Sequence, residues 1–489
     1  MVLSDGCLFV ASTRGPLHLC AISRTGETVH SLNQQLRAVW SYLLFSTLPM
    51  ASILLRLTSR PGLDIRPFCK GASCGLREIL KASSRSPSIW LDAYPMAAIH
   101  SSIRSKAGVA LSLGGADGCG LSSVGGRLLY SILLAGESIV SWCQPARQSG
   151  TEDLSLRPCD LHCILSFLSS SGSSLFDNSS DVWLSFGLPG LSTSGPVQAL
   201  LRKVAIGGPL GVGGDSQGPV VRRVLSPLCS DCHTDSRNCN KKVIPPLNPC
   251  ETRPSFLTLV LIAIGGGSST GTEGVGDSEN GTRSEGIPIT TPLIDCLTTR
   301  AAKTTQSLLD AGVTSAVLKA VGASVSWDVA ISQLHSSLGL PPPSPNLPSN
   351  PNALCLMHWV YCVKSSRQWS SCPSWPPGLS VDHSRRKSLL RAYSHLYSSV
   401  CIPPTRHALS AFSWPLVDGS PGGLRVSLVS AINSTNALVI AAWGFAGGSG
   451  NATEQGLPSD VVIALMEKLA KTLKLQNDRF FLLPGPPTY

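Results

Sequence analysis

The sequence predicts an α+β fold: two β-α-β units, with two helices on a four-stranded sheet, split by an insertion. Two amphipathic helical patterns flanked by short apolar runs predict the units. Charged residues make up only 14% of the chain, beside 46 Gly and 36 Pro, so we expect a low-complexity, largely disordered N-terminal half. The predicted division is 1–291 mostly disordered, 292–332 first unit, 333–423 insertion, 424–483 second unit and 484–489 Pro-rich tail.

The second unit has the clearest pattern. Residues Ala437–Ala442 form an apolar run long enough for one buried strand, and a glycine-rich turn follows it at 444–450. Leu465, Leu469 and Leu473 then recur every fourth residue, which predicts an amphipathic helix. The apolar run 480–483 completes the unit as a strand.

The first unit begins at Pro292, where the apolar run 292–297 predicts a short strand. Apolar residues from 302 to 321 keep helical spacing, although Gly312 inside that helix costs roughly 1 kcal/mol. Residues 325–332 alternate between apolar and polar side chains, which predicts a half-buried strand.

The insertion 333–423 is rich in Pro, Ser and Trp and has no clean period. It is either a large surface excursion or a gene-model error, and the sequence leaves both open. The apolar run 424–429 is expected to resume the sheet.

The N-terminal half gives no sustained periodicity. Residues Arg127–Trp142 are apolar enough for a strand or a helix, and the pattern does not decide between them. The segments Ser41–Leu55 and Phe256–Ile264 fall short of the roughly 20 residues that a membrane span needs, so no transmembrane helix is predicted. The start of the chain lacks the pattern of a signal peptide, which predicts a cytoplasmic protein with free thiols.

Charge and cysteine patterns predict neither nucleic-acid binding nor a cofactor. The net charge of +10 is spread thinly along the chain, which favours solvated surface over a nucleic-acid groove. Cys229, Cys232 and His233 have the spacing of a haem attachment motif, and Cys239 and Cys250 lie nearby as zinc candidates. A second Cys-x-x-Cys pair is lacking, so we interpret the motif as incidental and expect no metal.

Two motifs in the second unit carry a family resemblance. The turn from Trp443 to Asn451 contains Gly447 and Gly448, and an Asp-Arg-aromatic string at 478–480 follows the helix. Together with the proline-led segment at Pro292, these motifs resemble the macrophage migration inhibitory factor family of tautomerases, over roughly 292–332 and 424–483. The resemblance implies a cytokine-like homotrimer, leaderless secretion and a phenylpyruvate-type isomerase that acts on a small 2-keto acid.

The resemblance also implies site residues. Pro292 takes the place of the catalytic base, Trp443 and Phe481 line the substrate pocket, and Gly444 lies at an anion-binding turn. Because Thr291 precedes Pro292, the proline nitrogen is an amide, and the chain is an enzyme only if Pro292 becomes a free N-terminus. The alternative roles are a strand-start proline for Pro292, core packing for the two aromatic residues and simple turn geometry for Gly444.

A different class of function remains open. The tail Pro486–Tyr489 has the Pro-Pro-x-Tyr form that WW domains bind. The alternative to a tautomerase is therefore a disordered interaction protein, or a mis-spliced translation product without enzymatic function.

Overall fold

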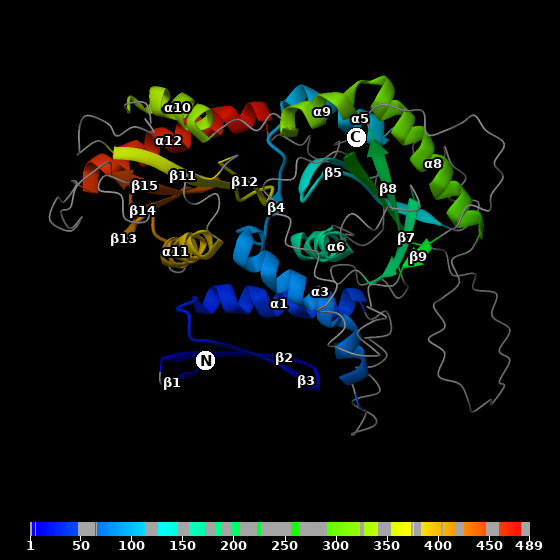
Figure 1. Ribbon diagram of the computed structural model, residues 1–489, viewed down its shortest axis with the longest axis horizontal. Helices are drawn as coiled ribbons and strands as arrows, with labels where there is room; N and C mark the ends of the chain where they lie inside the picture. The colour runs from blue at the N-terminus through cyan, green and yellow to red at the C-terminus, as the bar shows by residue number, and fades with distance from the viewer. Residues whose placement is uncertain are drawn as a thin grey trace.

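The structure is a computed structural model. It describes residues 2–4, 6–46, 64, 66–112, 126–144, 156–171, 181–187, 197–205, 223–225, 256–264, 291–322, 327–340, 354–372, 375, 383–401, 404–415, 425–445 and 459–480. The N-terminal part of this range contains strands β1 Val2–Ser4, β2 Cys7–Arg14, β3 Leu17–Ser23 and β4 Tyr94–Pro95, with helices α1 Val29–Ser46, α3 Arg66–Arg85, α4 Ser88–Leu91 and α5 Ser101–Ser112. The described residues form one three-stranded and two six-stranded sheets (Figure 1).

The first six-stranded sheet has the order β6-β5-β10-β8-β7-β9. Its elements are β5 Arg127–Ala135, β6 Ser138–Cys143, α6 Pro158–Ser171, β7 Asp181–Phe186, β8 Val197–Ala205, β9 Arg223–Leu225, β10 Phe256–Ile264, α8 Thr291–Asp310 and α9 Val313–Gly322. Both faces are covered: Leu257, Leu259 and Leu261 of β10 pack with α5, α8 and α9, whereas Val260 and Ile262 pack with α1, α3 and α6. Burial on two faces explains why β10 is a continuous apolar run.

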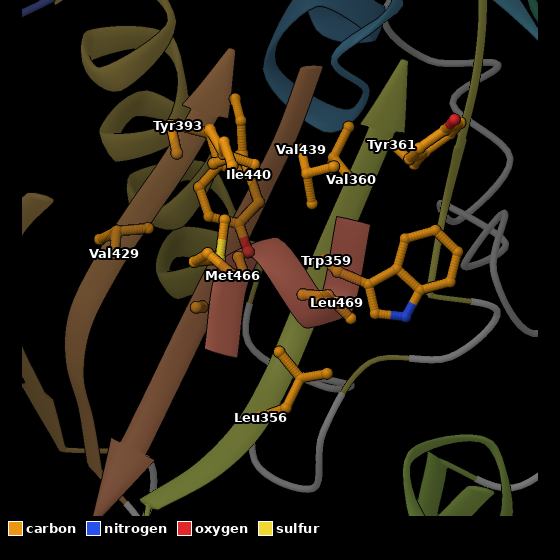
Figure 2. Close-up of a cluster of buried hydrophobic side chains, with 14 of the residues drawn as sticks. Leu356, Trp359, Val360, Tyr361, Tyr393, Val429, Val439, Ile440, Met466 and Leu469 are labelled. Atoms are coloured by element: carbon orange, nitrogen blue, oxygen red, sulfur yellow. The ribbon is translucent and has the colours of Figure 1, made fainter. Parts of the chain in front are cut away.

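The second six-stranded sheet has the order β13-β14-β15-β11-β12-β4. Its elements are α10 Trp327–Leu338, β11 Leu354–Val363, β12 Gln368–Ser371, α11 His383–Cys401, β13 His407–Pro415, β14 Arg425–Asn433, β15 Ala437–Phe445 and α12 Ser459–Phe480. Helices α10 and α12 lie on one side of this sheet and α11 on the other (Figure 1). Figure 2 shows Met466 and Leu469 of α12 at the buried strands, with Tyr393 of α11 in the same cluster.

The two sheets repeat one topology. In each unit a hairpin (β5–β6, β11–β12) leads to a helix (α6, α11), then to three long strands (β7, β8 and β10, or β13, β14 and β15) and a final helical segment. The first unit has the short strand β9 in addition, between β8 and β10 in the chain. The sheet orders β6-β5-β10-β8-β7 and β12-β11-β15-β14-β13 match strand for strand, with the last strand, β10 or β15, between the hairpin and the other two. The chain therefore contains two like α/β units in tandem.

Strand β4 joins the two units. It pairs in parallel with β12, and the next residue, Met96, forms a parallel bridge with Ile139 of β6. The Ala97 amide donates to the Ile139 carbonyl at 2.9 Å. Strand pairing therefore passes from one six-stranded sheet to the other through β4.

This architecture corrects the expected fold class. In place of one four-stranded sheet split by an insertion, the described residues form two complete units, and the expected disordered half supplies most of the first. Pro292 opens helix α8 rather than a strand, and 325–332 lie mostly in helix α10. The expected excursion 333–423 contains β11, a central strand of the second sheet.

Some local predictions are confirmed and others are corrected. Strand β15 begins at Ala437 as expected, and helix α12 contains the leucines that predicted it. The run 127–142 is a hairpin whose turn holds Gly136 at a positive φ of 59°. Gly312, also at positive φ (65°), separates α8 from α9, so the expected continuous helix is broken there. The strand expected at 480–483 is wrong at Phe480, which ends α12, and its other residues lie outside the described range.

Candidate functional site

A cavity of about 1260 Å³ lies where the two units meet. Its walls come from both units and from the N-terminal helices. Residues from α1, β4, β6, α6 and the β11–β12 turn line it: Arg37, Trp40, Tyr94, Trp142, Cys159 and Arg367.

Two tyrosine hydroxyls fix one wall by holding the backbone of a single residue, Leu156. The Tyr94 hydroxyl donates to the Leu156 carbonyl, and the Leu156 amide donates to the Tyr130 hydroxyl at 2.6 Å. The Tyr94 ring stands edge-on to Trp142, with ring centroids 4.7 Å apart and an angle of 81° between the planes. Burial raises the pKa of Tyr94, so its hydroxyl keeps its proton and remains a donor at neutral pH.

An ion pair between two strained turns also lines the cavity. Asp92 and Arg367 both have positive φ, 49° and 51°, and Arg367 Nη1 lies 3.3 Å from Asp92 Oδ2. The backbone carbonyl of Arg367 also accepts from the Tyr94 amide at 2.6 Å. A non-glycine residue in the left-handed region costs about 1–2 kcal/mol, so these contacts hold the two turns in conformations that neither adopts cheaply alone.

The lining is cationic and aromatic, and two of its titratable side chains, Cys159 and His162, are neutral at pH 7. Arg14, Arg37 and Arg157 join Arg367 there, against the single carboxylate of Asp92 among the described lining residues. Burial raises the pKa of the Cys159 thiol to about 12. Burial likewise lowers the pKa of His162 to about 4, while its Nε2 lies 3.2 Å from the Ser88 carbonyl.

These shifts keep a neutral thiol and a neutral imidazole in the cavity at pH 7. A cysteine that acts as a nucleophile needs a lowered thiol pKa, and the pKa of Cys159 is raised. The cavity wall is therefore suited to holding a partner group by cationic and aromatic contacts.

The residues implied by the tautomerase resemblance lie in different places. Pro292 is exposed in the first turn of α8, on the first unit, where a proline is well tolerated because the first helical amides have no partner within the helix. Trp443 and Gly444 lie in β15 of the second unit, and Gly444 pairs with Cys355 and Val426. Phe481 lies outside the described residues. The structure does not bring Pro292 and Trp443 to one site.

Trp443 is a core residue. Its side chain is fully buried, and its Nε1 donates to the Ser430 hydroxyl at 2.6 Å. Satisfying this polar group allows the large ring to lie in the apolar interior at little cost.

The junction residues Asp92, Tyr94 and Arg367 were missed by sequence reasoning. They are far apart in the chain, and only the pairing of β4 with β12 brings them together. A glycine in a sequence indicates where a positive φ can occur, whereas nothing in the sequence indicates that an aspartate or an arginine adopts one.

The remaining predictions concern the cysteine motif, the C-terminal tail, metal binding and membrane spans. The cysteine motif at 229–233 with Cys239 and Cys250, and the Pro486–Tyr489 tail, lie outside the described residues. Within the described ranges, no three His, Cys, Asp or Glu side chains gather as a metal site would require. None of the described helices combines the length and apolar character of a membrane span.

Comparison with known proteins finds relatives that the sequence motifs did not indicate. No family model matches the chain. Over 192 residues, 39% of the chain, it is 26% identical to vacuolar fusion protein MON1 homolog A of Macaca fascicularis and of Homo sapiens, and 25% identical to that of Gallus gallus. The chain is similar to MON1 proteins. The matched stretch spans 31%, 26% and 32% of the lengths of these relatives.

The similarity to MON1 overturns the tautomerase interpretation. The detected relatives are vacuolar fusion proteins, so the expected macrophage migration inhibitory factor family, isomerase activity and cytokine-like character are wrong. The 2-keto acid substrate and the family homotrimer are withdrawn with them. The glycine turn and the Asp-Arg-aromatic string were too short to identify a family, because a strand, a turn and a helix recur in many folds.

Proposed function

We propose that this chain acts in membrane fusion as a MON1-like protein, through contacts with other proteins rather than through catalysis. The observation that carries the proposal is the 192-residue similarity to vacuolar fusion proteins of three species. Of the two classes considered from sequence, the interaction protein is therefore favoured over the enzyme.

The architecture supports the proposal. Two like units, joined through β4, form a long layered body with helices on both sides (Figure 1). Such a body offers several separate helix faces and strand edges to partners. The junction cavity adds a cationic and aromatic surface between the units.

The buried ionisable groups of the second unit also have a structural role. Burial raises the pKa of Cys355 and of Cys362 to about 12, and lowers the pKa of His358 to about 3. The His358 ring is stacked on Trp375 with centroids 4.2 Å apart and bonds the Tyr393 hydroxyl at 3.1 Å. These groups are therefore neutral packing elements at pH 7.

The test is complementation in human cells that lack MON1 homolog A. The full chain is expressed there, and fusion of vacuolar compartments is measured by the mixing of two luminal dyes. We expect dye mixing to rise above that of the empty vector.

Two aspartate variants serve as controls at matched expression. Val360→Asp places a charge in a fully enclosed core and should abolish the rescue, whereas Val461→Asp changes an exposed residue of α12, outside the cavity lining, and should retain it. A well-expressed, folded chain that leaves dye mixing at the vector level would contradict the proposal.

A further inference from the structure

The junction cavity carries positive charge that no carboxylate of the described residues balances. Arg14 lies at the end of β2, Arg37 on α1 and Arg157 directly before α6, and all three line the cavity. Within the described part of the chain none of their guanidinium groups forms an ion pair, whereas Arg367 is paired with Asp92. Three such cations around one concave surface raise the local concentration of anions.

Another carboxylate close to Arg157 is engaged with the backbone. Asp160 is fully buried in α6, and it is not part of the cavity lining. Its Oδ2 accepts from the Arg157 amide at 3.0 Å, which satisfies a backbone donor at the start of the helix. The Arg157 guanidinium is therefore left without a counter-ion in the described residues.

Arg14 adds a donor that is not satisfied. Its Nε is buried and has no hydrogen-bond acceptor within the described residues. Leaving a buried, charged donor unpaired is costly, so such a group in a native structure calls for an explanation. Because Arg14 lines the cavity, a ligand oxygen there supplies the missing acceptor. The guanidinium fork matches phosphate oxygens in particular, which it can bind two at a time.

The lining also supplies neutral donors for phosphate oxygens. Five serine side chains belong to it: Ser41, Ser105, Ser112, Ser365 and Ser366. Each hydroxyl group can donate one hydrogen bond without adding charge. A ligand with several anionic oxygens therefore finds both cations and hydroxyl donors in this cavity.

The aromatic residues favour a ligand that also has a flat ring. Trp40 of α1 and Trp142 of β6 line the cavity and are only half-buried. The Tyr94 ring packs edge-on against Trp142 and helps to fix its position. Proteins hold nucleic-acid strands with the same combination, because bases stack on aromatic rings while basic side chains meet the phosphates.

The size of the cavity agrees with a ligand of two parts. Its volume of about 1260 Å³ exceeds the roughly 300–1,000 Å³ that is typical of small-molecule sites. A planar ring and a chain of phosphates can therefore lie in it together. Helices α1 and α6 pack against each other beside it, so the walls come from elements that support one another (Figure 1).

We propose that the junction cavity binds an organic phosphate that carries a planar ring, of the class of nucleoside di- and triphosphates. The phosphates meet Arg14, Arg37 and Arg157, and the ring packs against Trp40 and Trp142. A ligand that binds the folded chain alone also stabilises it, so the melting temperature should rise on binding. This proposal goes beyond the proposed function and does not rest on it.

The experiment is calorimetric titration of the purified full chain with ATP. Tripolyphosphate has the phosphates without the ring, and adenosine has the ring without the phosphates. We expect one ATP to bind per chain, and each of these two partial probes to bind at least about tenfold more weakly. The affinity for ATP should fall as the salt concentration rises, because salt screens the charges of exposed arginines.

Inositol trisphosphate separates a soluble nucleotide from the headgroup of a lipid. It carries several phosphates on a ring that is not flat, so it should bind about as weakly as tripolyphosphate.

Four variants locate the ligand. Arg37→Gln and Arg157→Gln change exposed side chains of the lining, and each should raise the Kd for ATP by about tenfold or more. Arg85→Gln, at an exposed arginine of α3 outside the lining, is the matched control and should bind ATP as the wild type does. Trp40→Leu should weaken the binding of ATP and leave that of tripolyphosphate unchanged, which a general loss of structure would not do.

A titration with ATP that gives neither heat nor a rise in melting temperature overturns the proposal. Tripolyphosphate or inositol trisphosphate that binds as tightly as ATP also overturns it, because the cavity is then a general anion site or a site for a lipid headgroup. Binding of ATP that neither arginine variant weakens places the ligand elsewhere and contradicts the assignment. These titrations involve no membrane fusion, so this proposal and the proposed function fail separately.

Discussion

Asp92 and Arg367, the two non-glycine residues at positive φ in the described part of the chain, form an ion pair across the junction of the two units. One belongs to the turn before β4 and the other to the β11–β12 turn. The left-handed backbone conformations of both turns therefore lie where β4 joins the two sheets. Substitutions at these turns should change the free energy of unfolding in a way that depends on the junction.

Arg367 offers a matched pair of substitutions. Arg367→Gly loses an exposed ion pair worth about 0–1 kcal/mol but relieves a left-handed backbone strain of about 1–2 kcal/mol, so stability should change little. Arg367→Val loses the same pair and puts a β-branched residue at positive φ, so it should destabilise by more than about 1 kcal/mol. Urea unfolding followed by circular dichroism measures both, and equal losses would contradict the assignment of strain.

Gly75 marks the close crossing of α1 and α3. A Cβ atom there would lie 1.7 Å from the Tyr42 hydroxyl oxygen, so Gly75→Ala should destabilise by about 1–3 kcal/mol through overpacking. Gly108→Ala is the control in helix α5, where the nearest atom, Ser141 Oγ, is 3.4 Å away. That change should be neutral or stabilise by up to about 1 kcal/mol. The midpoint of thermal unfolding should therefore fall for Gly75→Ala and stay level or rise for Gly108→Ala. A tolerated Gly75→Ala would refute the crossing.

The ion pair of Arg202 with Asp181 joins β8 to β7. It is bidentate, at 2.6 and 2.5 Å, and its side chains are only 9% and 18% exposed. Removing one partner leaves a nearly buried charge, so Asp181→Val or Arg202→Met should each cost about 3 kcal/mol. The double variant Asp181→Val/Arg202→Met should recover much of that loss. A double-mutant cycle on unfolding free energies measures the coupling, and simple additivity would show that the pair is not a unit.

Acid should destabilise the chain through two buried histidines. Burial lowers the folded-state pKa of His162 to about 4 and of His358 to about 3, both below the ordinary value of 6.5. The unfolded state therefore binds protons first, so this stability is present above pH 6.5 and is lost as the pH falls toward the folded values. For His162 the full loss is roughly 3 kcal/mol.

His162→Asn and His358→Phe should each flatten the decline in unfolding free energy between pH 6.5 and 4. The comparison is made against wild type across that range. An unchanged slope in both variants would contradict the buried, neutral state of these rings.

Sequence reasoning succeeded where a pattern was local. Strand β15 is a plain apolar run, and α12 repeats leucine at every fourth residue, so both were predicted. It failed at β11 for two reasons. Leu354–Val363 is buried on both faces and therefore shows no alternation of apolar and polar residues. The prolines at 341–351 also led to the prediction of an irregular insertion there. The continuous apolar run from Leu354 was the available signal.

Other failures came from contacts that no local pattern records. Pro292 fits the first turn of a helix as well as the start of a strand, and the alternation around Ile331 also fits one face of α10. The pairing of β4 with β12 joins segments more than 270 residues apart, so the junction with Asp92 and Arg367 could not be read from either segment.

The account rests on two like units joined through β4, and hydrogen exchange at that strand tests this most directly. The amides of Tyr94, Met96 and Ala97 donate to the carbonyls of Arg367, Trp369 and Ile139, at 2.6, 3.1 and 2.9 Å. We predict that these three amides in the intact chain exchange as slowly as those of β11 and β5. Exchange of all three at the rate of an unstructured peptide, while β11 and β5 remain protected, would contradict the joined architecture.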